Sequence, residues 1–429
     1  MTAFRRLWWA TGIDNLGSGA YTAAVPLVTV TVTHDPRLVS LVSTAAYLPW
    51  LLLSLPAGAL ADRHDRADQV LDRVPDGVPL TRHDAVEDRE VRDRRGVEAR
   101  GLAALRRQAQ LMWRSQALQA ALVAVTAILA AFGEAGIPVL VVTAFGIGAG
   151  DVVFGTAAQA ILPDLVPKSR LHRANGHQQA ITTITGQFAG PPLGSLLFGV
   201  AGALPFGFDA VSFALSALLV ATLPRRTSQV TTRPAVREGL TWLLRHRLLR
   251  TLALLLGVNT FCGQLAYATL VLLATEVVHL DARGYGVLLA GAALGSVLGG
   301  LVNARIVARI GALPALVVAL TANAGAFAGI GLSPNAVVLG SFLAVTGFVT
   351  TMWNIVTVGF RQQLVPPALL GRVTSVNRFL GWGLIPLGTL AGGQVAHALG
   401  LRAPYLVAAA LRGLALVVAL PVLIRAVRD

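Results

Sequence analysis

Two aspartates lie inside long apolar stretches of the sequence, where an ionisable side chain is costly and marks a functional site by default. Asp14 lies about two turns into the first stretch, and Asp151 lies about 14 residues into the fourth. A carboxyl group kept from water holds its proton more readily and can exchange it near neutral pH. We expect Asp151, and Asp14 second, to bind a proton or a cationic substrate. The structural alternatives are a helix cap for Asp14 and a hydrogen bond to a neighbouring helix for Asp151.

Motifs for other chemistry are missing from the sequence. The only lysine, Lys168, follows Pro167, which excludes the phosphate-binding loop of ATPases. Cys262 is the only cysteine, which excludes an intrachain disulfide and a cysteine-based zinc site. The eight histidines show no metal-ligand spacing. We therefore expect no enzymatic activity and no cofactor.

The composition indicates how these residues are positioned. Of the 429 residues, 55% are hydrophobic and only 13% are charged, against about 25% charged in soluble domains. Charge-free windows exceed the roughly 20 residues needed to cross a bilayer. Taking Gly, Pro and charge clusters as breaks, we predict an all-α polytopic membrane protein with twelve transmembrane helices. They lie at about 7–32, 39–61, 112–132, 137–162, 174–201, 205–223, 250–275, 284–306, 312–332, 335–360, 372–398 and 403–424.

The basic residues predict how the helices are oriented, because cytoplasmic loops of membrane proteins are enriched in Lys and Arg. Outside residues 67–107, all but four of them fall on one side of the twelve predicted helices. We expect a multi-pass protein of the bacterial plasma membrane with both termini in the cytoplasm. The net charge of +14 then lies near anionic lipid of the inner leaflet, and we expect no nucleic-acid partner. The exceptions are Arg37, Arg283, Arg402 and Arg412.

The connection between the sixth and seventh helices contains an amphipathic segment. Apolar residues recur there at helical spacing beneath a basic face, which favours a helix lying on anionic lipid over a solvated linker. Its apolar residues are Val236, Leu240, Leu243, Leu244 and Leu248.

An internal repeat divides the chain. Asp14 matches Asn259 at an offset of 245 residues, whereas Val166 and Pro167 match Val365 and Pro366 at an offset of 199. The fall in offset indicates an insertion in the first half, and the highly charged residues 67–107 are the candidate. We expect this segment to be disordered or loosely helical. The predicted units are a six-helix half at 1–223, a linker at 224–249 and a six-helix half at 250–429.

Several motifs resemble those of the major facilitator superfamily. The run Gly58 to Arg66, GALADRHDR, resembles the superfamily's G-x-L-A-D-R-x-G-R signature. A glycine and proline pattern in the fifth helix is similar to the motif of its exporters, with Ser195 in place of the last glycine. The run Asp209 to Phe213, DAVSF, is similar to the branch that contains enterobactin and macrolide exporters. The resemblance covers nearly everything outside 67–107, and it implies two pseudo-symmetric six-helix halves.

The first of these motifs suggests a cytoplasmic gate. A carboxylate interacts favourably with the exposed amides at a helix N-terminus, and the repeat suggests the eleventh helix, beginning near Gly371, as the partner of Asp62. The alternative is that the charged cluster only retains the loop on the inner side. The gate residues are Asp62, Arg63, Arg66, Gly371 and Arg372.

The exporter-like motif places small residues on one face of the fifth helix. Gly186, Gly190 and Gly194 recur every four residues, so another backbone can approach closely. Pro191 removes an amide donor and bends the helix. We expect a sliding or sealing face, with ordinary small-residue packing as the alternative.

The resemblance implies that helices one, four, seven and ten line a central cavity. Two charged residues receive other interpretations: Asp209 as part of the N-cap region of the sixth helix, and Arg412 as a buried cation whose partner the sequence does not name. The arginine that proton-driven drug antiporters carry in helix four is missing at Thr143 to Phe145. The polar or aromatic candidates for the cavity wall are Tyr21, Gln159, Asn259, Gln264, Tyr267, Trp353 and Asn354.

These features favour a monomeric secondary transporter that works by alternating access. We expect it to export a small amphipathic compound, such as a drug, siderophore or secondary metabolite, in exchange for protons. Two alternatives remain: an importer or uniporter of a small solute, and a transport-inactive scaffold or sensor whose charged insertion binds a partner.

Overall fold

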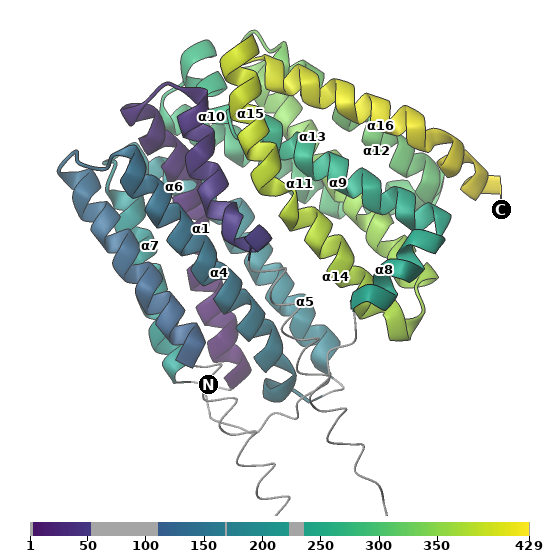
Figure 1. Cartoon of the computed structure of the whole chain (residues 1–429), viewed down its shortest axis with the longest axis horizontal. Coiled ribbons are helices and arrows are strands. Elements are labelled where there is room, and N and C mark those ends of the chain that lie inside the picture. The colour runs from purple at the N-terminus through teal and green to yellow at the C-terminus, as the bar shows by residue number, and fades with distance from the viewer. Residues whose placement is uncertain (1–2, 53–109, 168–169, 223–235, 429) are drawn as a thin grey trace, which may run out of the picture.

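The computed structural model describes residues 3–52, 110–167, 170–222 and 236–428, and helices make up nearly all of these residues. Figure 1 shows α1, α4, α6 and α7 on one side of the molecule and α9 and α12–α16 on the other. We call the helices up to α7 the first half and those from α9 onward the second half. The described elements are α1 (Ala3–Val32), helical residues 36–52, Gln110–Ala131, α4 (Ile137–Leu165), α5 (Leu171–Thr182), the π-helix η2 (Thr183–Ala189), α6 (Gly190–Phe198), α7 (Leu204–Ala221), α8 (Val236–Arg245), α9 (Arg247–Tyr267), α10 (Leu270–Leu272), the π-helix η3 (Leu273–Val277), α11 (Ala282–Ile310), α12 (Ala312–Gly331), α13 (Ala336–Leu364), α14 (Pro367–Gly383), α15 (Ile385–Leu399) and α16 (Ala403–Arg428).

Within the described residues, nine helices are long and apolar enough to cross a membrane. The other predicted spans are also helical where they are described. α1 is long but interspersed with polar residues, the second span is described only as far as residue 52, and the fifth is divided into α5, η2 and α6. Polytopic helical architecture is therefore confirmed, and the count of twelve stays a prediction.

Local sequence explains where several helices begin and end. Asp281 caps α11 by accepting a hydrogen bond from the Gly284 amide at 2.8 Å. Asn335 caps α13 in the same way through the Val338 amide at 3.0 Å. Gly400 follows α15 with a φ of 91°, a backbone conformation that glycine adopts without steric cost. The helix ends are thus encoded by single residues next to the apolar runs.

One predicted boundary is wrong. The eleventh span was expected to begin near Gly371, but α14 begins at Pro367, about one turn earlier. A proline fits the first turn of a helix because it lacks an amide hydrogen that would be unpaired there. The exposed amides therefore precede Gly371, and no atom lies within 4 Å of a Cβ built on that glycine.

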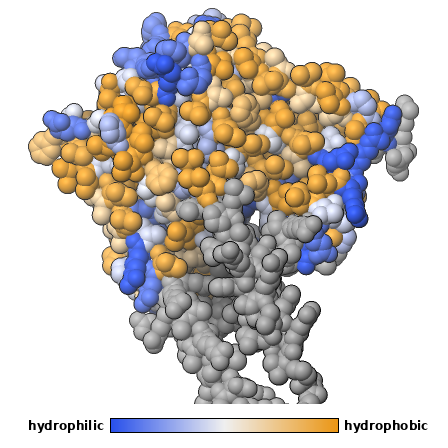
Figure 2. All heavy atoms as spheres, in the orientation of Figure 1, coloured by the Kyte–Doolittle hydropathy of each residue, from blue (hydrophilic) through white to orange (hydrophobic). Residues whose placement is uncertain are grey.

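The surface between the helix ends is largely apolar. Figure 2 shows hydrophobic residues over most of the visible face, with hydrophilic residues gathered towards its margins. An apolar surface of this extent suits contact with lipid chains. Large exposed side chains of this kind include Leu118, Val142, Leu218, Val287 and Leu414.

The two halves share one apolar core at one end of the molecule. Leu27 and Val30, near the C-terminal end of α1, pack with Val39 in a cluster that also contains Leu272 and Tyr405 of the second half. Two further clusters lie within the first half and another lies within the second. The shared cluster therefore joins the halves at the end where α1 terminates, which we call the outer end, following the orientation predicted from the basic residues.

Candidate functional site

The two predicted carboxylates are held by glutamines of one neighbouring helix. Gln116 Nε2 donates to Asp14 Oδ1 at 2.9 Å, and Gln119 Nε2 donates to Asp151 Oδ1 at 2.8 Å. Gln116 and Gln119 are one turn apart on Gln110–Ala131, so they present both amides on the same face. The helix Gln110–Ala131 therefore connects α1 and α4 through hydrogen bonds to one acid on each.

The acids differ in exposure. Asp14 lies well inside α1 and is 5% exposed, so its interpretation as a helix cap is wrong. Asp151 is partly exposed and does make the interhelical hydrogen bond that was its structural alternative. Partial exposure combined with a single side-chain donor leaves Asp151 accessible to exchange a proton or contact a cation.

A third buried carboxyl belongs to the same region, and sequence reasoning missed its role. Asp209 is fully buried within α7, whose N-cap is Ala203. The predicted N-cap role for Asp209 is therefore wrong. Ser212 Oγ donates to Asp209 Oδ1 at 3.1 Å. The signal was the DAVSF run itself, because its acid and serine are three residues apart and share a helix face.

Tyr21 lies beside these acids. Its ring packs edge-on against Phe206 of α7, with centroids 5.7 Å apart. Asp209 and Asp151 both interact electrostatically with it, and its buried hydroxyl has no hydrogen-bond partner among the described residues. Tyr21 therefore lies on the contact between α1 and α7 that also holds Asp209, and its place in a cavity wall stays a prediction.

The second half holds a buried arginine instead of acids. Arg412 of α16 is 8% exposed, and its Nη2 donates to the Asn259 carbonyl at 2.8 Å. The guanidinium lies 3.9 Å from the centroid of the Phe327 ring, a distance at which cation–π attraction is strong. The partners of Arg412 are therefore a backbone oxygen, a ring face and the buried side chain of Cys262. Asn259 makes this contact through its backbone carbonyl and not through its side chain.

Tyr267 and Gln264 lie on the same helix, α9. The Tyr267 hydroxyl is hydrogen-bonded to Thr346 Oγ1 of α13 at 3.2 Å, and its ring packs edge-on against Phe327. The Gln264 Cβ lies 3.0 Å from a Cβ built on Gly388. These residues therefore contribute to packing between α9 and its neighbours α12, α13 and α15.

The structure separates Trp353 and Asn354 from that group. They follow Thr346 by about two turns on α13, or about 12 Å along the axis. Both line a cavity of about 70 Å³ with Thr357, Arg361 and Asn377. This volume suits a few water molecules and is below the range of pockets for drug-sized ligands.

The glycines of the fifth span pack against α1, as the close-approach prediction required. A Cβ on Gly190 would lie 2.6 Å from Gly19 Cα, and one on Gly194 would lie 2.1 Å from the Ala20 carbonyl oxygen. Gly186 carbonyl oxygen lies 2.6 Å from a Cβ built on Gly19. The span passes from the π-helix η2 into α6 at Gly190, next to Pro191.

The second half repeats this packing. A Cβ on Gly388 would lie 2.5 Å from the Phe261 carbonyl oxygen, and one on Gly392 would lie 2.1 Å from that of Leu265. Thus α15 approaches α9 as α6 approaches α1. Sequence comparison at the 199-residue offset missed this correspondence because the matching glycines are 198 residues apart.

Of the described gate residues, Arg372 has a partner on α8, and the contact of Asp62 with the eleventh span stays a prediction. Arg372 forms an ion pair with Glu238 of α8. α8 packs against α14 so closely that a Cβ on Gly239 would lie 2.5 Å from Arg372 Cβ. Leu243 of α8 is buried, whereas Leu240 and Leu244 are exposed. Asp62, Arg63, Arg66 and residues 67–107 lie outside the described residues.

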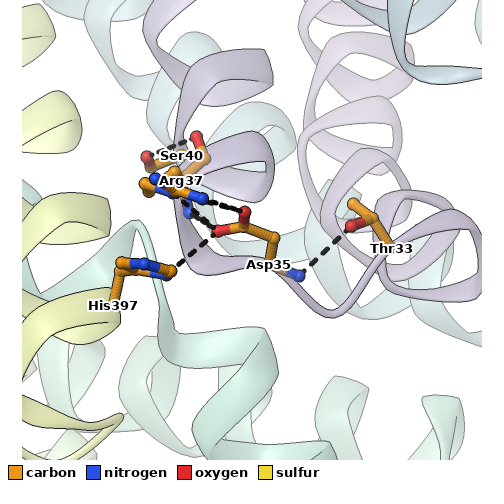
Figure 3. A network of polar contacts seen from close by, with 5 residues as sticks. All are labelled: Thr33, Asp35, Arg37, Ser40 and His397. Carbon is orange, nitrogen blue, oxygen red and sulfur yellow. Dashed lines mark hydrogen bonds and ion pairs between the residues drawn. The ribbon is translucent and has the colours of Figure 1, made fainter.

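Polar contacts also connect the halves at the outer end. Figure 3 shows His397 of α15 pointing at Asp35, with Nδ1 3.6 Å from Oδ1. His34 Nδ1 lies 2.7 Å from Glu276 Oε1. Arg37 donates to Asp35 from both its side chain and its backbone amide, and these hydrogen bonds hold the pKa of Asp35 below its usual value. Each histidine contact becomes an ion pair when its imidazole is protonated.

Comparison with known proteins identifies the family. The family model described as Major Facilitator Superfamily matches residues 117–386, well over half of the chain. The chain belongs to the major facilitator superfamily. A second model, described as transmembrane secretion effector, matches residues 1–73. The predicted resemblance is confirmed, and members of this superfamily are transporters, not enzymes.

Individual relatives of this superfamily member are distant. The multidrug efflux pump Tap of Mycobacterium tuberculosis is 26% identical over 423 residues, covering 93% of this chain and 88% of Tap. The nucleoside transporter NupG is 14% identical over 98% of this chain and 99% of its own, with a TM-score of 0.63. A bacterial homologue of the iron transporter ferroportin, in its inward-facing state, is 14% identical over 97% and 98%, with a TM-score of 0.65. The solved structures show the shared fold.

Proposed function

We propose that this major facilitator protein is a proton-coupled exporter of a small amphipathic compound, such as a drug, siderophore or secondary metabolite. Similarity to a multidrug efflux pump over 93% of the chain supports export. Asp151 and Asp14, which lie inside spans of the first half, supply groups that can exchange protons within the membrane. Transport proceeds by alternating access between the two halves, residues 1–223 and 250–429, joined by residues 224–249.

The observation that carries this proposal is the position of Asp151. It lies midway along α4, it is partly exposed, and one glutamine amide holds it in place. An ionised carboxylate inside a membrane favours either a proton or a cationic ligand. Because Asp14 lies close enough to interact electrostatically with Asp151, protonation of one affects the other. Proton binding and cation binding at Asp151 are therefore mutually exclusive, which is the basis of exchange.

The conformation fits the inward-facing step of such a cycle. The shared apolar cluster and the contacts of His34 and Asp35 with the second half all lie at the outer end. The Thr44 and Thr389 hydroxyls, 2.9 Å apart, extend this closure inward. The excess of basic residues at the other end of the helices supports a cytoplasmic location for both termini.

Other residues have supporting roles in this proposal. Tyr21, Asn259, Gln264 and Tyr267 contribute to the wall near the substrate, and Trp353 and Asn354 contribute nearer the inner end. The glycine face on α6 permits α1 to move against it without side-chain clashes. Arg372 closes the inner side in the alternate state, and α8 lies at the inner leaflet, where anionic lipid attracts its arginines. We propose that the transporter works as a monomer.

A gradient-driven efflux screen tests the proposal. Inside-out vesicles carrying the wild type, Asp151→Asn or the control Glu134→Gln, which changes an exposed carboxylate, are energised with an inward-acidic proton gradient and presented with a panel of amphipathic cations and neutral drugs. We expect uptake by the wild type and the control, and at least a tenfold lower rate with Asp151→Asn, corresponding to about 1.4 kcal/mol. Equal rates in all three would overturn the coupling assignment.

The same vesicles separate the alternatives. Accumulation only in right-side-out vesicles would identify an importer, and flux that ignores the proton gradient would identify a uniporter. A protein that moves no compound of the panel, yet loses a bound partner when residues 67–107 are deleted, would be a scaffold or sensor. Each of these results would replace the exporter assignment.

A further inference from the structure

Asp209 is a buried carboxyl that the proposed exchange at Asp151 does not use. Its side chain is fully buried, and Oδ1 accepts a single side-chain hydrogen bond, from Ser212. Oδ2 is buried and has no partner among the described residues. A buried polar atom without a partner is uncommon in folded proteins and calls for a specific explanation.

The register of α1 against α7 places Asp209 beside the transport carboxyls. A Cβ on Gly17 would lie 2.5 Å from Asp209 Oδ1, so Asp209 points at the α1 backbone. Asp14, Gly17 and Tyr21 follow one another at spacings of three and four residues and therefore form one stripe on α1. That stripe contacts Gln116 at its inner end and Phe206 at its outer end. Asp209 lies between these contacts.

The charges that act on Asp209 are all negative. Within the described chain they are Asp14 of α1 and Asp151 of α4, and α6, which also packs against α7, has no ionisable residue. An ion held by one hydroxyl group and buried from water costs several kcal/mol, and like charges nearby add to that cost. A proton on Oδ2 removes the charge.

We propose that Asp209 is a third proton-binding carboxyl of the transport site. The proton binds at the unpartnered Oδ2 and removes a negative charge that would otherwise lie against the α1 backbone, near Asp14 and Asp151. Binding and release move one proton and consume none. The inference rests on the proposed exchange at Asp151, but the presence of a proton on Asp209 can be tested separately.

Infrared difference spectroscopy of the purified protein tests the proton directly and needs no substrate. The carbonyl stretch of a protonated carboxyl is recorded through an alkaline titration in the wild type, Asp209→Asn and Glu134→Gln. We expect a band that persists in the wild type and the control after solvated carboxyls have ionised, and that disappears in Asp209→Asn. An identical band in all three proteins, or no such band in the wild type, would overturn the proposal. Asparagine matches the shape of aspartate and retains an acceptor for Ser212, which preserves the fold.

One further measurement separates a transport role from a structural one. In energised inside-out vesicles, Asp209→Asn should shift the pH profile of ethidium uptake. An unshifted profile at wild-type rates would show that the proton on Asp209 serves structure alone and would overturn its place in the transport site. If the wild type moves no ethidium, the spectra still decide the proton site, and the failure belongs to the proposed function.

Discussion

The two halves of the molecule use the same backbone packing but bury opposite charges. In both, a glycine face of one helix meets the backbone of another: α6 on α1 and α15 on α9. Among the described residues the first half buries Asp14 and Asp209, whereas the second buries Arg412. The arginine is held by a carbonyl oxygen and an aromatic ring, and the acids are held by neutral amides and a hydroxyl.

This contrast distinguishes the residues that hold the helices together from the residues that could exchange protons. Packing of glycines against backbone is needed wherever two helices approach closely, so both halves retain it. A permanently charged guanidinium bound to backbone anchors α16 on α9, because it cannot release its proton at physiological pH. Carboxyls held only by neutral donors can be either charged or neutral. In the proposed mechanism, the first half performs the exchange and the second half provides the surface against which it moves.

The shared packing predicts the largest effects. Gly194→Leu and Gly392→Leu each place a side chain where a Cβ already lies 2.1 Å from a carbonyl oxygen. We expect each to cost about 3 kcal/mol or more, because neither partner is a flexible side chain. Size-exclusion chromatography of the detergent extract measures the loss of folded protein. The control, Gly325→Leu, has no atom within 4 Å of its Cβ and should fold normally. Loss in only one half would break the equivalence of the two packing faces.

Tyr21 of the first half and Tyr267 of the second half test the difference in chemistry between the halves. Tyr267→Phe removes a hydrogen bond to Thr346 and should lower the free energy of unfolding by about 1 kcal/mol. Tyr21→Phe removes a hydroxyl with no described partner and should leave stability nearly unchanged while it changes the pH dependence of transport. Thermal unfolding and vesicle uptake measure the two effects. The reverse pattern would place the exchange in the second half.

The smallest expected effects concern the outer contacts. Because the pKa of Asp35 is lowered, its ionised form is present at neutral pH, and its contribution is lost only when the pH falls through that lowered value. The contact between the halves at Asp35 should therefore weaken in strong acid. Exposed ion pairs contribute little free energy, so we expect the population of the closed state to change severalfold at most.

Spin labels report this closure. Val32→Cys and Leu399→Cys place labels on exposed positions of the two halves near the outer end. The distance distribution should favour the closed state at neutral pH and shift towards longer distances in strong acid. Substitution of asparagine at Asp35 should remove that shift. A distribution that does not depend on pH in the labelled protein with Asp35 would show that this contact does not influence the gate.

The sequence predicted the helices better than their contacts. Long apolar runs mark spans because the bilayer requires both length and apolar character. The start of α14 was misplaced because Pro367 can begin a helix as readily as end one. Glycine spacing predicted the face of α6 but could not show that α1 packs on it. Such contacts depend on how helices are placed in three dimensions.

The site was predictable only in part. Asp14 and Asp151 stood out because acids are rare inside spans. Asp209 did not, because Pro205 and the nearby predicted helix start made a terminal position equally plausible. Arg412 donates to a backbone oxygen. Every residue has such an oxygen, so the sequence could not indicate which one would be the partner. The ion pair of Arg372 with Glu238 joins two helices whose packing the repeat did not indicate.

The central claim is that exchange depends on the carboxyl of Asp151. In proteoliposomes with a trapped pH indicator, addition of a transported compound to the wild type should move protons in the direction opposite to that compound. Asp151→Asn should still bind the compound, yet the indicator should not respond to its addition. Proton movement of equal size in both proteins would contradict the account.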